Sequence, residues 1–175
     1  MYRREAPLTR KTDLTLTMIR HAEKDHSSSS DPGLSQRGEL QAQKLGQYFR
    51  EQPVLEKLPT IMSSPKRRCA DTASRIAEVW SVPVTGSNAI DEQWSNESER
   101  EFSKRMDFVF RSVTHGQFGP FVIFISHADV LAELTNLLCQ WVKLDVPTAL
   151  SPGSLHLLRV SLTKSQFLKK NFRPG

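Results

Sequence analysis

The sequence contains few cysteines and no long apolar run. Cys69 and Cys139 are the only cysteines among 175 residues. Both fall in segments expected to be helical, so a framework of disulfide bonds is not expected. No apolar stretch approaches the roughly 20 residues that a membrane-spanning helix needs, and the first residues lack the apolar stretch of a secretory signal. These absences lead us to expect a cytoplasmic protein with no membrane contact.

The positive charge of the chain is concentrated at its two ends. Of the formal net charge of +5, residues 1–11 carry +3 and residues 164–175 carry +4, which leaves −2 for the residues between them. A surface that binds nucleic acid would spread Lys and Arg along one face of the ordered elements. We therefore expect no nucleic-acid partner. Residues 1–13 are interpreted as a basic extension that precedes a single domain at residues 14–175.

Apolar patterns along the chain alternate between those of strands and those of helices. Strand patterns occur at residues 14–19, 60–63, 121–125, 155–162 and 167–172. Helical spacing or a helix start signal occurs at residues 35–51, from Ser64 to about residue 80, at 102–113 and at 130–141. A loop is expected around residues 83–93. The alternation predicts an α/β fold, a three-layer α/β/α sandwich with a mostly parallel central sheet.

Three of the expected strands end in residues that suit an anion better than a core. Arg20 and His21 follow the first strand, Ser64 follows the second with Arg68 one helical turn further on, and His127 follows the third. In an open α/β sheet the carboxyl ends of the strands line the ligand crevice, so these side chains can meet there. A helix starting at Ser64 would direct its N-terminal N–H groups to the same edge, which favours phosphate.

The order and spacing of these motifs resemble the histidine phosphatase superfamily, also called the phosphoglycerate mutase-like family. The resemblance spans residues 14–162. The motifs that carry it are Met18-Ile-Arg-His-Ala-Glu-Lys24, Leu34-Ser-Gln-Arg-Gly38, Ser63-Ser-Pro-Lys-Arg-Arg-Cys-Ala-Asp-Thr-Ala73, Ile125-Ser-His127 and Pro152-Gly-Ser-Leu155. The resemblance implies the phosphoglycerate mutase-like fold and a phosphoric monoester hydrolase of the small phosphatase branch, working without metal or cofactor.

The resemblance also implies a role for each residue of the pocket. His21 would be the nucleophile that accepts the phosphoryl group, while Arg20, Arg68 and His127 would hold the phosphate oxygens. These types suit the task, because phosphoryl transfer needs charge stabilisation and Arg offers a fixed fork of donors. Arg68 matches the family spacing, whereas Arg67 would point about 100° away around the helix.

Two further groups concern the protons of the reaction. The resemblance places the acid that protonates the leaving group at Glu92, with Asp91 as the alternative. A nucleophilic His21 must be neutral, and its second ring nitrogen needs a fixed acceptor for its proton. We expect that acceptor to be the carbonyl group of Gly38 or of a neighbouring residue.

Two other features near the pocket are given structural interpretations. Asp129 stands where the family has a small neutral residue, and we expect it to cap the helix that follows His127. His21 and His26 lie five positions apart, whereas a helical zinc pair is four apart, and no third ligand of suitable spacing follows. We therefore expect no metal site, and His26 is expected to be a loop residue.

The leading functional interpretation is a phosphatase with a phosphohistidine intermediate. Its substrate would be a phosphomonoester or protein phosphohistidine, so its partners would be a phosphorylated small molecule or a phosphoprotein. A phosphoglycerate mutase-type phosphotransferase would use the same pocket, and so would a non-catalytic module that binds phosphate or phosphoprotein. The chain is short between Glu92 and Phe121 and between Leu144 and Leu155, which leaves little room for the covering loops that a mutase uses.

Overall fold

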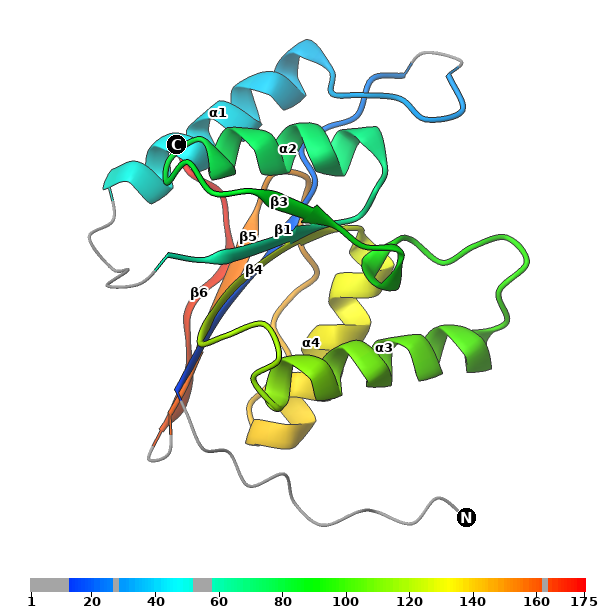
Figure 1. Cartoon of the computed structure of the whole chain (residues 1–175), viewed down its shortest axis with the longest axis vertical. Coiled ribbons are helices and arrows are strands. Elements are labelled where there is room, and N and C mark those ends of the chain that lie inside the picture. The colour runs from blue at the N-terminus through cyan, green and yellow to red at the C-terminus, as the bar shows by residue number, and fades with distance from the viewer. Residues whose placement is uncertain (1–12, 27–28, 52–57, 162–163) are drawn as a thin grey trace.

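Strands and helices alternate along most of the chain (Figure 1). The computed structural model describes residues 13–26, 29–51, 58–161 and 164–175, so the expected basic extension lies outside the described residues except at Asp13. The strands are β1 (Leu14–Arg20), β2 (Thr60–Ser63), β3 (Val84–Gly86), β4 (Phe121–Ser126), β5 (Leu155–Val160) and β6 (Ser165–Phe172). The helices are α1 (Gln36–Glu51), α2 (Arg67–Ala77), α3 (Glu99–Thr114) and α4 (Ala128–Val142), with a short 3₁₀ helix, η1, at Asn88–Ile90.

The six strands form one sheet in the order β3-β2-β4-β1-β5-β6. The first four strands in this order are parallel to one another, while β5 pairs antiparallel with β1 and β6 pairs antiparallel with β5. Helices α1 and α2 pack together on one side of the sheet, and α3 and α4 pack together on the other side (Figure 1). The predicted three-layer sandwich with a mostly parallel sheet is confirmed.

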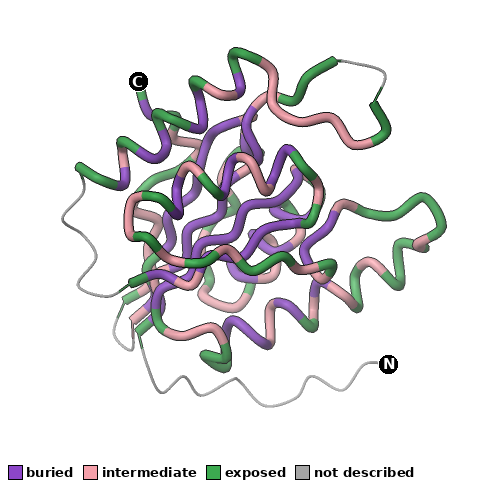
Figure 2. Tube along the Cα trace, turned by 45° about the horizontal axis from the view of Figure 1, so that its top comes forward, coloured by how far each residue is buried: buried purple, intermediate pink, exposed green. Residues whose placement is uncertain are grey.

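The two faces of the sheet bury separate apolar clusters. Val122 and Phe124 of β4 point toward α3 and α4, whereas Ile123 and Ile125 point toward α1 and α2. Every residue of β4 is buried, because this central strand is covered on both faces (Figure 2). Burial of this continuous apolar run stabilises the sheet and makes the end of β4 a rigid support for the residues that follow it.

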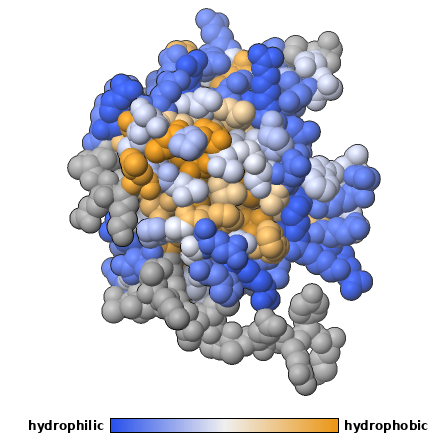
Figure 3. All heavy atoms as spheres, viewed as in Figure 1, coloured by the Kyte–Doolittle hydropathy of each residue, from blue (hydrophilic) through white to orange (hydrophobic). Residues whose placement is uncertain are grey.

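Strand β3 was not predicted from the sequence, which indicated a loop at 83–93. It is three residues long and pairs only with β2, so it forms an edge of the sheet. A strand this short has too few residues to set up an apolar alternation. Apolar residues gather around this edge on the face drawn in Figure 3. The 3₁₀ helix that follows is capped by Ser87, whose hydroxyl oxygen accepts the N–H of Ala89.

Helix α2 begins later than predicted. Its N-cap position is Lys66, whereas the sequence pattern indicated Ser64 with Pro65 in the first turn, and the helix ends at Ala77 instead of near residue 80. The Ser64 hydroxyl accepts the N–H of Lys66 at 3.2 Å, but it also contacts a buried carboxylate and an imidazole. Ser64 therefore belongs to the pocket at the sheet edge and not to the helix.

No helix within the described residues combines the length and the apolar character that crossing a bilayer requires.

Candidate active site

The carboxyl ends of three adjacent strands bring the predicted pocket residues together. In the register of the sheet, Arg20 at the end of β1 lies opposite Ser126 at the end of β4. Ser63 at the end of β2 lies opposite Ile125 of β4. The segments that continue from these ends are joined by further hydrogen bonds, from the His21 N–H to the Ser126 carbonyl oxygen at 3.0 Å and from the Ser64 N–H to the Ile125 carbonyl oxygen at 3.0 Å.

His21 is buried and fixed by a hydrogen bond to the main chain. Its Nδ1 lies 2.7 Å from the carbonyl oxygen of Ala22, which can only accept, so Nδ1 carries the proton and Nε2 keeps its lone pair. The predicted acceptor at Gly38 is thus wrong, and the acceptor is the next residue in the chain. Burial lowers the pKa of His21 to about 4, and the positive charges of Arg68 and Arg20 add to the effect. His21 is therefore neutral near pH 7.

The two arginines bring more hydrogen-bond donors to the pocket than the described residues satisfy. A guanidinium group has five N–H donors. Arg20 donates from Nη1 to the carbonyl oxygen of Leu150 at 3.0 Å, and its buried Nε has no partner among the described residues. Arg68 donates from Nη2 to Glu92 at 2.6 Å, and its buried Nε also has no partner in the described chain. The pocket can thus offer further charged donors to an anion.

The choice of Arg68 over Arg67 agrees with the orientation of helix α2. The Arg68 side chain is only 7% exposed and reaches the pocket, whereas the Arg67 side chain is 70% exposed and lies 3.8 Å from Asp71 one turn further on. The hydroxyl group of Thr72 donates to the Arg68 carbonyl oxygen at 2.7 Å and accepts the Ala22 N–H at 3.1 Å. Thr72 therefore ties the segment after the nucleophile to the helix that carries Arg68.

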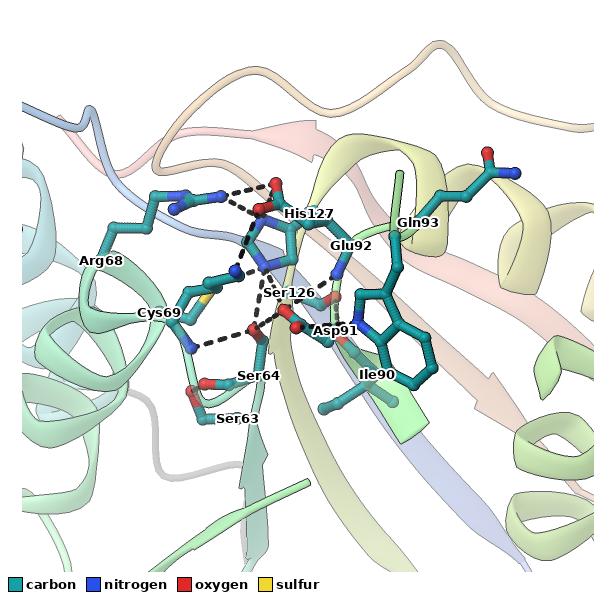
Figure 4. Close-up of polar contacts among 12 residues, drawn as sticks. Ser63, Ser64, Arg68, Cys69, Ile90, Asp91, Glu92, Gln93, Ser126 and His127 are labelled. Carbon is teal, nitrogen blue, oxygen red and sulfur yellow. Dashed lines mark hydrogen bonds and ion pairs between the residues drawn. The ribbon is translucent and has the colours of Figure 1, made fainter. Parts of the chain in front are cut away.

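His127 is held between two sets of polar groups (Figure 4) and lies next to His21. The two imidazole rings are 5.2 Å apart between centroids. Nε2 of His127 lies 2.9 Å from the Ser64 hydroxyl oxygen, and Nδ1 lies 3.3 Å from Nη2 of Arg68. Burial lowers the pKa of His127, as does the charge of Arg68, although nearby carboxylates oppose the shift. Like His21, this ring is neutral in the free protein near pH 7.

Glu92 and Asp91 are adjacent in the chain but have different surroundings (Figure 4). The Glu92 side chain is 38% exposed and contacts Arg68 at 2.6 Å and Lys66 at 3.6 Å. Burial opposes ionisation, but the hydrogen bond and the charge of Arg68 lower the pKa of Glu92. Asp91 is buried, and its two oxygens accept hydrogen bonds from Ser64 and from Trp94. Of the two carboxylates, Glu92 is the one that is exposed to solvent.

The segment that carries these two acids is fastened by Arg105 of helix α3. Its Nη2 and Nε contact the Glu97 carboxylate at 2.6 and 2.7 Å, and its Nη1 donates to the carbonyl oxygens of Asp91 and Ala89. The guanidinium also stacks over the Trp94 ring, 4.9 Å from the centroid. Arg105 and Glu97 were not identified from the sequence, since a charged residue on an amphipathic helix and a charged residue in the loop before it usually both lie in solvent. Lys66, 3.6 Å from Glu92, was missed as well.

The remaining expectations near the pocket have mixed outcomes. Asp129 does not cap helix α4, whose N-cap is His127, and instead accepts the N–H of Gln93 at 2.8 Å. His26 is exposed, outside any helix or strand. Gly38 allows α1 to approach the segment that follows His21, because a Cβ added at Gly38 would lie 2.0 Å from the Glu23 carbonyl oxygen. Among the described residues, no three potential ligands gather into a metal-binding cluster.

The comparisons with known proteins agree with this geometry. Residues 16–96 match the sequence model of the histidine phosphatase superfamily (branch 1). No curated protein sequence matches the chain. Among solved structures, mycobacterial glucosyl-3-phosphoglycerate phosphatase with inorganic phosphate superposes with a TM-score of 0.66 at 20% identity, covering 92% of this chain and 98% of that one.

Two further solved structures share the fold. The α-ribazole phosphatase from Shigella flexneri has a TM-score of 0.70 at 16% identity, covering 91% of this chain and 97% of that chain. The protein histidine phosphatase SixA, complexed with tungstate, has a TM-score of 0.66 at 13% identity, covering 92% and 97%. The motifs, their meeting at one sheet edge and the sequence match agree with one another: residues 16–96 match the histidine phosphatase superfamily (branch 1), and the chain shares the fold of these solved structures.

Proposed function

We propose that this protein is a metal-independent phosphatase that transfers the phosphoryl group of its substrate to Nε2 of His21 and then hydrolyses the phosphohistidine. The observation that carries the proposal is the state of His21. The ring is neutral, its Nδ1–H is held by the Ala22 carbonyl oxygen, and Arg20 and Arg68 are close enough to lower its pKa. A neutral imidazole with a free lone pair among fixed cations suits attack on a phosphate.

The first chemical step forms the Nε2–P bond and breaks the bond between phosphorus and the leaving atom of the substrate. Arg20, Arg68 and His127 hold the oxygens of the transferred group, where donors fixed in advance stabilise the charge of the transition state. The buried Nε–H groups of Arg20 and Arg68, which have no partner among the described residues, support this role for the two arginines. The leaving atom departs with an electron pair and takes a proton from the enzyme.

Glu92 supplies that proton. In the free protein its carboxylate contacts Arg68, and this contact lowers its pKa. When the phosphate takes over the donors of Arg68, Glu92 loses this stabilisation and faces a dianion, and both changes raise its pKa. Asp91 is unsuited to the step, because hydrogen bonds from Ser64, Trp94 and the Glu92 N–H outweigh its burial and keep its pKa low.

The second step restores the enzyme. A water molecule attacks the phosphorus of phosphohistidine 21 and gives its proton to the Glu92 carboxylate, the Nε2–P bond breaks, and inorganic phosphate leaves. His21 is then neutral again, with the same hydrogen bond to the Ala22 carbonyl oxygen. The substrate is a phosphomonoester or protein phosphohistidine. The names of the three structural relatives support phosphatase action, but they have no substrate in common.

The test is the release of phosphate from p-nitrophenyl phosphate and from a phosphohistidine-containing protein in excess chelator. The wild-type chain is expected to hydrolyse at least one of them, and His21→Ala is expected to abolish the reaction. His26→Ala, a change at an exposed histidine in the neighbouring loop, is the matched control and should keep full activity. A chain that binds phosphate but releases none from either substrate would instead be a non-catalytic binding module.

A further inference from the structure

A buried chain of hydrogen bonds connects His127 to Asp91 through Ser64 (Figure 4). The Ser64 hydroxyl donates to Oδ1 of Asp91 at 2.7 Å, and the Ser64 oxygen lies 2.9 Å from Nε2 of His127. The three residues are 0% to 5% exposed. Asp91 is also fixed from its other side by the indole N–H of Trp94 at 3.2 Å. Neither Ser64 nor Asp91 has a part in the reaction as proposed so far.

The contacts of this chain determine where its protons lie. The Asp91 carboxylate can only accept, so the single hydroxyl proton of Ser64 points to Asp91 and the Ser64 oxygen accepts from Nε2–H of His127. On the other edge of the ring, Nη2 of Arg68 can only donate, so Nδ1 of His127 is the acceptor. In the free protein, His127 is thus the neutral tautomer with its proton on Nε2.

This tautomer turns the wrong group toward a phosphate. Nδ1 faces Arg68 and Glu92, the groups proposed to act on the phosphate, and its lone pair would repel an oxygen of a dianion. A ring that donates to the phosphate needs a proton on Nδ1, while Nε2–H remains bound to Ser64. We propose that His127 takes up a proton when a phosphate dianion enters, and that Asp91, through Ser64, is the positioning residue that stabilises the resulting imidazolium.

The charged groups around His127 agree with such a switch. Arg68 opposes protonation in the free protein, while Glu92, Asp91 and Asp129 favour it. His21 is neutral, and burial raises the pKa of the Cys69 thiol, 3.4 Å from Nε2, to about 12, so neither of these neighbours carries charge near pH 7. A bound dianion would neutralise the effect of Arg68 and add negative charge beside Nδ1. Both changes favour the imidazolium.

The inference rests on the proposed function. Glu92 complicates its test, because this carboxylate also loses its contact with Arg68 when an anion binds, which raises its pKa. The experiment therefore uses Glu92→Gln, which removes that carboxyl group. Tungstate is the probe, since it remains a dianion across neutral pH and any proton taken up must come to rest on the protein. Calorimetric titration of the full chain at pH 8 in buffers of different ionisation enthalpy counts the protons taken up for each tungstate bound.

We expect Glu92→Gln to take up close to one proton per tungstate. Adding Asp91→Asn or Ser64→Ala is expected to remove most of this uptake and to weaken tungstate binding about tenfold, the change that corresponds to one pKa unit of His127. Nitrogen-15 spectra of the wild-type chain provide a readout that needs no variant. They should show His127 protonated at Nε2 in the free protein and at both nitrogens in the tungstate complex.

Three results would overturn the inference: tungstate binding without proton uptake in Glu92→Gln, uptake that persists after Asp91→Asn, or a neutral His127 in the complex. None of these would affect the proposed function, which depends on turnover and on His21. Conversely, turnover that is retained in both the wild type and His21→Ala would contradict the proposed reaction. The titration of His127 could still be measured in that case.

Discussion

Replacing Arg68 with alanine tests the electrostatic part of the proposed mechanism. This side chain is 7% exposed and reaches Glu92 at 2.6 Å and His127 at 3.3 Å. Its loss would remove a charged donor from the transferred phosphoryl group. The loss of one fixed donor to a developing charge typically lowers the rate by at least ~10²-fold, or about 2.7 kcal/mol of transition-state stabilisation.

Arg67→Ala is the matched control for this prediction. The Arg67 side chain is 70% exposed, and its ion pair with Asp71 at 3.8 Å is a surface pair between neighbouring turns of α2. Such pairs contribute about 0–1 kcal/mol to the free energy of unfolding, so activity should change less than about twofold. Arg68→Lys should fall between the two variants, because lysine keeps the charge but loses the planar fork.

The assay is the initial rate of p-nitrophenyl phosphate hydrolysis, with thermal unfolding of each variant measured in parallel. Glu92 is 38% exposed and keeps Lys66 at 3.6 Å, so Arg68→Ala leaves no fully buried carboxylate without a partner and should still fold. Equal losses of activity in Arg67→Ala and Arg68→Ala, at unchanged stability, would refute the assignment of Arg68 to the phosphate pocket.

Three other predictions follow from local geometry. Gly38→Ala should lower the free energy of unfolding by about 1–3 kcal/mol in urea titration, since its Cβ would lie 2.0 Å from the Glu23 carbonyl oxygen. Arg105→Ala should cost about 2 kcal/mol and reduce turnover, because it frees the segment that carries the acid; an unchanged kcat would contradict that role. His21 and His156 each have a pKa of about 4 in the folded chain and about 6.5 when unfolded, so the unfolded state binds more protons between these values. Stability should therefore decline as pH falls from about 6.5 to about 4, and His156→Gln should make this decline shallower.

The strands and the convergence of the pocket could be predicted from the sequence because both depend on strong local signals. The apolar run at residues 121–125 favours a central buried strand, and the carboxyl ends of parallel strands meet by topology. Strand β3 could not be predicted, since Val84–Gly86 is an edge strand specified by pairing with β2 and not by its own pattern.

Details of the site depend on contacts between distant segments, which a local pattern does not contain. Ser64 is of a residue type that commonly caps a helix, yet its hydroxyl group donates a hydrogen bond to Asp91, 27 positions away. Asp129 likewise lies near the start of a helix, where a capping residue is expected, but it accepts a hydrogen bond from the Gln93 N–H of another segment. The acceptor for His21 was sought at a distance and is the adjacent Ala22 carbonyl oxygen.

The most direct test of the account is to identify the residue that carries the phosphoryl group. Brief incubation with a labelled phosphoryl donor, quenching without acid and peptide mapping would locate any label that is stable to base and labile to acid. The account predicts such a label on His21, present in wild type and absent in His21→Ala. A label on a serine, aspartate or another histidine would contradict it.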